Sequence, residues 1–444
     1  MVYMLIPYFV LYGLIIWIIY KRNTNIIIND LFWLIISWTA MLGIYLFSGI
    51  SYFYVPGLKT WLYIVAFFCV YILGRSFGMR TKIDTSSGKK IRVNDNILLF
   101  LTVLGAVLRL YDIIRLNGFL SANRSDVHSS FMGIIGSFLS PLGLPLFLKI
   151  GFQAKSENRR IPIKAFFALI LYVLPVIFLS GRLNLIFALI ALICLLLYKP
   201  YTIDENVPTV RELLANKSGR GKRVAITAVI VAGVIAFLRY SNYIIGNRFK
   251  NFDTMLVISG LNDSFTLTEN AKPFYDNFGA FGSLVFQVLN YYSAQFKNVA
   301  LLVEQFHGPH SFGLVQLHYI ARRSQFFQNI VQSTNDAVRA ATVVGGRAFD
   351  GSGASWVTVV GDMVIDFGMI GGLFVIFIIS MLIGRKRAVF LNAPNNSYEL
   401  SIQVMLCVCM FFTIQLSPFF ETSLVYAFIW MWVLSNFRLG KTQR

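Results

Sequence analysis

The chain has 444 residues, of which 57% are hydrophobic and only 13% are charged, and its mean hydropathy is +0.66. Soluble domains are roughly 45–50% apolar and about 25% charged. This composition therefore excludes soluble, disordered and fibrous proteins, and it predicts an all-α, polytopic transmembrane helix bundle.

Eleven apolar runs are long enough, at about 20 residues each, to cross a bilayer. In chain order these runs are 2–20, 31–50, 58–77, 97–116, 131–151, 165–179, 183–198, 224–242, 355–384, 400–417 and 419–437. The sixth and seventh are short, which predicts local thinning of the bilayer, snorkelling ends or a re-entrant turn. All four cysteines (Cys69, Cys194, Cys407 and Cys409) fall within apolar runs and are expected to be packing residues.

The distribution of positive charge predicts the orientation of the chain. The first run is uncharged and is followed by Lys21 and Arg22, so we expect it to remain as a span with its N-terminus outside. With that orientation, 25 of the 39 Lys and Arg residues lie on the cytoplasmic side and 14 outside, as the positive-inside rule requires. The C-terminus is then cytoplasmic. Anionic membrane lipid accounts for much of the +19 net charge, and no nucleic acid is needed.

The chain divides into three parts: eight spans in 1–242, a large external loop in 243–354, and three spans in 355–444. Loops this long in a compact protein are usually functional, and this one is expected to contain short helices. Its stretch 280–303 is apolar enough to be an interfacial helix. Asn290 and Lys297 argue against a lipid-exposed span there.

Ten of the fourteen external basic residues are arginines, whose planar fork binds phosphate oxygens and stays charged. The group predicts a binding site for a lipid-linked phosphate or pyrophosphate, although each one could also be a loop residue paired with an external acid. The arginines assigned to pyrophosphate are Arg182, Arg239, Arg248, Arg322, Arg323 and Arg347. Arg182 lies in Ser180-Gly181-Arg182, the only connection between two apolar runs. It must therefore lie at the membrane surface or within the bundle, unless it snorkels to lipid headgroups.

Two carboxylates, Asp362 and Asp366, are spaced by four residues, which places them on one face of the ninth span. Their cost in the membrane requires a wet cavity or arginine partners. They are candidates for a general base or a sugar contact, and structural salt bridges are the alternative. The glycines that follow are expected to allow close helix packing; these are Gly368, Gly371 and Gly372.

Three external histidines, His307, His310 and His318, cluster beside Glu304. The spacing of the first two suits a metal site, but Gly308-Pro309 interrupts a helix between them and no cysteine completes a tetrahedral set. A proton acceptor or a sugar-hydroxyl partner fits better, with His310 as the catalytic candidate. The sequence contains no Walker A, kinase, zincin or nucleophile-elbow motif. The chemistry is expected outside, where nucleotide sugars are not expected, so an activated donor would have to arrive on a lipid.

The layout resembles the O-antigen (oligosaccharide repeat-unit) polymerases of the Wzy type. The resemblance rests on the number of spans, the one large external loop, the Ser180-Gly181-Arg182 connection, and Gly361-Asp362…Asp366-Phe367-Gly368-Met369-Ile370-Gly371 opening the span after that loop.

The resemblance implies a GT-C-like glycosyltransferase in the bacterial inner membrane, with its active site facing the periplasm. Such an enzyme joins undecaprenyl-pyrophosphate-linked repeat units without a metal or another cofactor. The donor and acceptor glycolipids, membrane lipids and a polysaccharide chain-length regulator would be its partners. Arginines would neutralise the leaving pyrophosphate, while Asp362, Asp366 or His310 would accept the hydroxyl proton or contact the sugar. A lipid-linked oligosaccharide flippase and an O-antigen ligase remain as alternatives.

Overall fold

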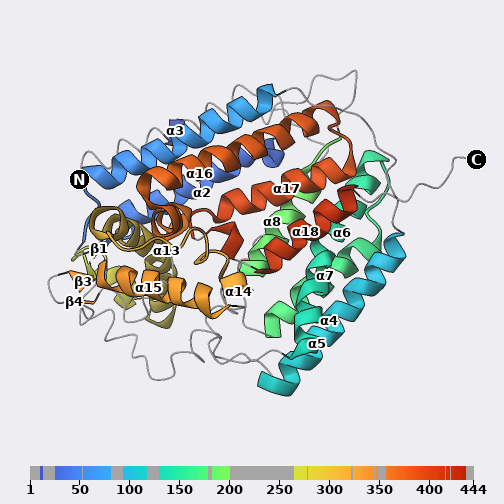
Figure 1. Ribbon diagram of the computed structural model, residues 1–444. Coiled ribbons are helices and arrows are strands. Elements are labelled where there is room, and N and C mark those ends of the chain that lie inside the picture. The colour runs from blue at the N-terminus through green and yellow to red at the C-terminus, as the bar shows by residue number, and fades with distance from the viewer. Residues whose placement is uncertain are drawn as a thin grey trace, which may run out of the picture.

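The structure is a computed structural model that describes residues 11–13, 26–52, 54–81, 94–117, 130–178, 183–200, 265–277, 279–321, 324–341, 343–344, 347–348, 357–415, 417–420 and 422–436. Within these ranges the chain is almost entirely helical (Figure 1), which confirms the predicted all-α class for the part that is described. The predicted spans 2–20 (apart from 11–13) and 224–242 lie outside the described residues.

The first half of the chain supplies these elements: η1 (Ile26–Ile28), α2 (Asp30–Phe47), β1 (Ile50–Tyr52), α3 (Leu58–Arg80), α4 (Asp95–Asn117), α5 (Phe131–Leu139), η2 (Ser140–Leu142), α6 (Gly143–Ser156), α7 (Ile163–Phe178) and α8 (Leu183–Leu197). The second half supplies β2 (Phe265–Leu267), α12 (Lys272–Asn277), α13 (Gly279–Gln305), α14 (His318–Ala321), α15 (Gln325–Ala341), β3 (Val343–Val344), β4 (Arg347–Ala348), α16 (Thr358–Asn392), α17 (Ser397–Phe412), η4 (Pro418–Phe420) and α18 (Thr422–Asn436).

Each of the nine predicted spans in the described part of the chain forms helix. Five helical segments are long and apolar enough to cross a membrane: Asp30–Phe47, Leu58–Arg80, Asp95–Leu116, Phe131–Ser156 and Thr358–Asn392. Four shorter apolar helices accompany them, and two of these, α7 and α8, are the runs whose shortness the sequence indicated. Of the cysteines, Cys194, Cys407 and Cys409 are buried as expected, whereas Cys69 is exposed.

Polar contacts join the helix ends in two layers, as an up-and-down bundle requires. At one end, the start of α2 contacts the end of α3 through Asp30, and Lys149 near the end of α6 pairs with Asp95 at the start of α4. At the other end, Asp112 near the end of α4 accepts the Ser130 amide before α5 at 3.2 Å. We call the first layer the Asp30 end, and we call the opposite layer, where α16 begins and His310 contacts it, the His310 end.

Among the described helices, α3 and α16 make the most extensive contact, and they run side by side in Figure 1. A Cβ at Gly78 would lie 1.9 Å from the carbonyl oxygen of Met381, and one at Gly384 would lie 2.0 Å from the carbonyl oxygen of Arg75. Gly74 faces Ser380 in the same way. Small residues four apart on both helices therefore let the backbones touch, as in membrane helix pairs.

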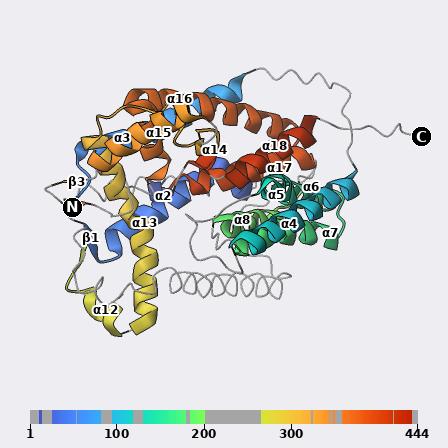
Figure 2. The same ribbon diagram turned by 60° about the horizontal axis from the view of Figure 1, so that its bottom comes forward.

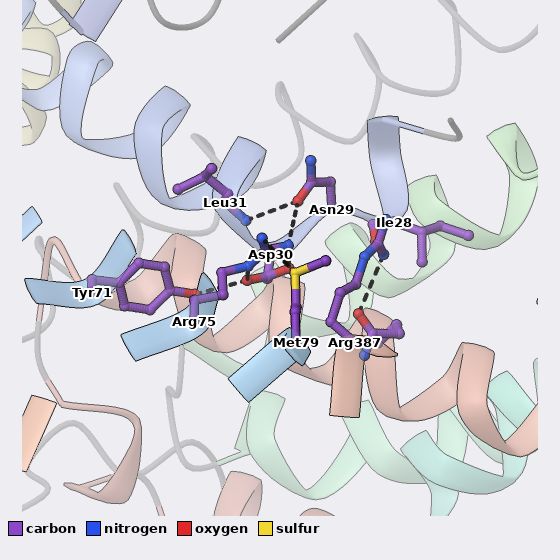
Figure 3. A network of polar contacts seen from close by, with 9 residues as sticks. Ile28, Asn29, Asp30, Leu31, Tyr71, Arg75, Met79 and Arg387 are labelled. Atoms are coloured by element: carbon purple, nitrogen blue, oxygen red, sulfur yellow. Dashed lines mark hydrogen bonds and ion pairs between the residues drawn. The ribbon is translucent and has the colours of Figure 1, made fainter. Parts of the chain in front are cut away.

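A buried network of charged side chains joins the helices at the Asp30 end (Figure 3). Arg75 donates from Nε to Oδ2 of Asp30 at 2.6 Å and from Nη2 to Oδ1 at 2.8 Å, and the Tyr71 hydroxyl donates to the same carboxylate at 2.8 Å. Arg387 of α16 donates to the carbonyl oxygen of Ile28. Because all three charged side chains are buried, Arg75 and Arg387 bind protein groups and not the lipid headgroups that the sequence analysis assigned to the cytoplasmic cations.

Helix α13 corresponds to the predicted interfacial stretch 280–303, and it lies across α2 and α16 (Figure 2). Its second half is enclosed in the core, because Phe296 and Leu302 are fully buried and Phe296 packs against Trp61. The external segment was expected to hold short helices, but α13 has 27 residues and α15 has 17. Strand β2 also pairs antiparallel with β1, with Tyr52 opposite Phe265.

Candidate functional site

The centre of the His310 end is a break inside α16. Gly368 has φ 72° and ψ 174°, which is not helical, and it divides α16 into Thr358–Phe367 and Met369–Asn392. Glycine adopts positive φ without steric cost. A break of this kind leaves backbone carbonyls without their helical donors, and in a buried setting those carbonyls need other partners. The sequence analysis had assigned Gly368 to helix packing.

The loop before α14 supplies those partners. His310 contacts the carbonyl oxygen of Ile365 through Nδ1 at 3.1 Å. The amide of Phe312 donates to the carbonyl oxygen of Asp366 at 2.8 Å. One of the predicted histidines is thus held directly against the helix that carries the two predicted carboxylates. The geometry therefore brings His310 beside Asp366, and Asp362 lies one turn earlier on the same helix.

The contact made by His310 fixes its tautomer. A carbonyl oxygen can only accept, so Nδ1 carries the proton, and in the neutral ring Nε2 then has a free lone pair. The ring packs edge-on against Phe306 at a centroid distance of 5.6 Å. A Cβ at Gly368 would lie 3.0 Å from Nε2, so the glycine also keeps that nitrogen clear. His310 is partly exposed, and its basic nitrogen is the one suited to accept a proton.

The carboxylate of Asp366 is fully buried and is occupied by the same loop. It accepts from the Ser311 hydroxyl, from the Val315 amide at 3.3 Å and from the Gln316 amide at 3.4 Å. This is how an N-cap side chain holds the first turn of a helix, here the turn that leads into α14. The geometry makes Asp366 a positioning residue for the His310 loop.

The carboxylate of Asp362 lies one turn earlier and is also buried. Its Oδ2 accepts the Ser417 amide, which follows α17, at 2.6 Å. The sequence analysis required arginine partners or a wet cavity for the two acids. The hydrogen bonds described for them come instead from backbone amides and a serine hydroxyl, which offset part of the cost of burying a carboxylate.

Of the predicted pyrophosphate ligands, only Arg347 is described, in β4 opposite Val344. Arg182, Arg239, Arg248, Arg322 and Arg323 lie outside the described residues. The residue after the Arg182 connection that is described in full, Asn184, is buried and accepts from the Ser423 hydroxyl at 2.8 Å. The start of α8 therefore lies beside the start of α18.

The other histidines are placed differently from His310. His307 is exposed, and His318 is the first residue of α14. Glu304 does not join them, because its carboxylate accepts from the Gly57 amide at 2.8 Å and from the Thr60 hydroxyl at 2.5 Å, at the start of α3. Among the described residues, no group of three or more His, Cys, Asp or Glu side chains could hold a metal ion.

Neighbouring helices close around this site. The Tyr319 phenol of α14 has a raised pKa, caused first by burial and then by the neighbouring Tyr426 of α18.

The sequence analysis missed Ser311, Phe312 and Ser417. Only the Gly313 that follows Phe312 hinted at a turn there, and nothing local marks Ser417 as a partner of a carboxylate 55 residues earlier.

Comparison of the chain with protein-family models, with curated proteins and with solved structures gives no match.

Proposed function

We propose that this chain is a membrane glycosyltransferase that polymerises undecaprenyl-pyrophosphate-linked oligosaccharide repeat units on the outer face of the bacterial plasma membrane. It would span the membrane eleven times, with the N-terminus and the His310 end outside. The observation that carries the proposal is the fixed His310 tautomer at the break in α16. The excess of arginine in the external segments supports it from the sequence.

In the proposed reaction, Nε2 of His310 accepts the proton of the acceptor hydroxyl. The hydroxyl oxygen then bonds to the anomeric carbon of the donor, and the bond from that carbon to the lipid pyrophosphate breaks. The leaving pyrophosphate takes the electron pair of that bond, and external arginines such as Arg182 would neutralise its charge. Asp366 positions the loop that carries His310. Asp362 joins the helix behind that loop to the segment after α17.

The break in α16 favours a second candidate, a lipid-linked oligosaccharide flippase. Discontinuous helices line the binding sites of many transporters because they expose backbone groups to the substrate. Here, however, the carbonyls at Ile365 and Asp366 are already satisfied by the His310 loop.

An O-antigen ligase would use an external histidine in the same chemical role as the polymerase.

Deletion of the gene in its own host separates the three functions. For a polymerase we expect surface glycan that carries a single repeat unit. A flippase would instead cause lipid-linked units to accumulate inside the cell, and a ligase would leave polymer unattached. Gel electrophoresis of surface glycan and analysis of lipid-linked intermediates measure this, and either of the last two phenotypes would contradict the proposal.

His310→Asn tests the proposed base while preserving the loop. The asparagine amide can still donate toward the Ile365 carbonyl, but it has no basic nitrogen. We expect the rate of polymerisation to fall by roughly 10²–10⁴-fold, the usual contribution of a general base. His307→Asn, at an exposed histidine three residues away, is the control and should retain the wild-type rate. Equal rates for the two variants at equal protein level would remove His310 from the reaction.

A further inference from the structure

The second half of α16 presents two different faces. One face is buried and contains the small residues that pack against α3. The other carries four exposed apolar side chains spaced by four residues: Ile370, Phe374, Ile378 and Leu382. They form a continuous stripe because residues four apart lie one above the other on a helix. At about 1.5 Å per residue, the stripe is about 18 Å long.

This stripe ends at the candidate site. Ile370, which is 86% exposed, lies two residues after the break at Gly368. Phe312 lies on the other side of that break, since its amide is bonded to the Asp366 carbonyl, and its ring is 78% exposed. Phe312 has φ 53°, an unusual conformation for a bulky residue. The bonds to Asp366 hold the loop there, so an exposed apolar ring on the loop that carries His310 lies on one side of the break and the stripe of α16 begins on the other.

The break also lies near the height of the lipid phosphates. The predicted span ends before Arg385, and its part after the break, Met369–Gly384, rises about 24 Å at about 1.5 Å per residue, against a hydrocarbon core of ~30 Å. With Arg385 at the cytoplasmic surface, the break lies in the outer part of the core, within about 6 Å of the phosphate level. An isoprenoid chain lying along the stripe would then present its phosphate beside His310.

We propose that Phe312 and the stripe Ile370–Phe374–Ile378–Leu382 form the docking track for the isoprenoid chain of a polyprenyl-phosphate-linked substrate. The inference rests on the proposed function for the identity of the substrate. It goes further by assigning the face of the bundle along which the lipid reaches the site. Ordinary membrane phospholipid is the competing occupant, and the experiment distinguishes the two.

The protein offers a matched control surface on α4. Phe100 of α4 is 65% exposed and Phe374 of α16 is 64% exposed, and both belong to exposed apolar stripes. The two helices lie at opposite sides of the bundle (Figures 1 and 2). Ile163 provides a second control, with the same 86% exposure as Ile370. A lipid that only surrounds the protein should contact the two residues of each pair to the same extent.

The full-length protein in nanodiscs is photolabelled with a benzophenone-tagged undecaprenyl phosphate, and the adducts are mapped by mass spectrometry. We expect the label on peptides that contain Phe312, Ile370 and Phe374, with at least fivefold less on those with Phe100 and Ile163. Unlabelled undecaprenyl phosphate should displace it. A benzophenone-tagged phospholipid should label both surfaces equally. Equal labelling of both surfaces by the polyprenyl probe, without competition, would overturn the track.

Kinetics provide the second test. Phe374→Ala should raise KM for an undecaprenyl-linked donor by roughly tenfold, because it removes apolar contact area from the bound lipid. The value of kcat should not change, and Phe100→Ala should match wild type. A wild-type KM for Phe374→Ala would contradict the track. If the probe labels Phe374 but the protein does not polymerise, the proposed function is contradicted and the isoprenoid site is still supported.

Discussion

Replacing Gly78 with leucine is expected to prevent the bundle from assembling. The new Cβ would lie 1.9 Å from the Met381 carbonyl oxygen and 2.9 Å from the Arg385 amide nitrogen. Both are backbone atoms, so no side-chain rotation can relieve the clash and the helices must separate. Overpacking usually costs about 1–3 kcal/mol. We expect the cost here to exceed that range, because separation also opens the neighbouring contact of Gly384 with the Arg75 backbone.

Gly78→Ala and Gly371→Ala form a graded pair for measuring this effect. Both gain up to about 1 kcal/mol from the higher helix propensity of alanine. At Gly371 the new Cβ would meet only Phe367 of its own helix, at 3.3 Å. Thermal melting in detergent, followed by size-exclusion chromatography, should show Gly371→Ala at or slightly above wild type and Gly78→Ala well below it. Equal melting temperatures would mean that α3 and α16 are not in contact at Gly78.

The sequence predicted the helices well, because apolar runs of span length have few alternatives. The run 58–77 became Leu58–Arg80, and the stretch 280–303 became α13, Gly279–Gln305. The predicted run 131–151 forms α5 and α6 with a short 3-10 segment at Ser140–Leu142, where Pro141 removes a helical donor. Periodicity and composition act along the chain, so they specify elements without specifying their partners.

The site was only partly predictable for the same reason. His310, Asp362 and Asp366 were selected by residue type and position. The roles of the acids depend on contacts across 50 or more residues, such as Gln316 with Asp366. The helix pattern through 355–384 also gave no sign of a break at Gly368, since glycines are common in membrane helices. The positive φ of Phe312 has no local signature beyond the Gly313 that follows it.

The buried network at the Asp30 end shows how charge counting can miss a structural role. Arg75 was counted with the cytoplasmic cations, yet its side chain lies inside the bundle with both Asp30 oxygens as acceptors. Removing one partner of a buried ion pair leaves the other charge uncompensated in a low dielectric, which costs about 3–5 kcal/mol. We therefore expect Arg75→Met to destabilise the protein by that amount, and Asp30→Asn to do so similarly.

The double variant Asp30→Asn/Arg75→Met distinguishes a buried pair from a loss of packing. Because it removes both charges, it should recover most of the stability lost in either single variant. The matched control is the pair Arg159–Glu157, whose side chains are 65% and 41% exposed. Its removal should change stability by less than about 1 kcal/mol, since water already solvates both groups. Melting temperatures of the single and double variants in detergent provide the cycle. Additive losses at Asp30 and Arg75 would mean that these residues stabilise the bundle by packing, with no coupling between their charges.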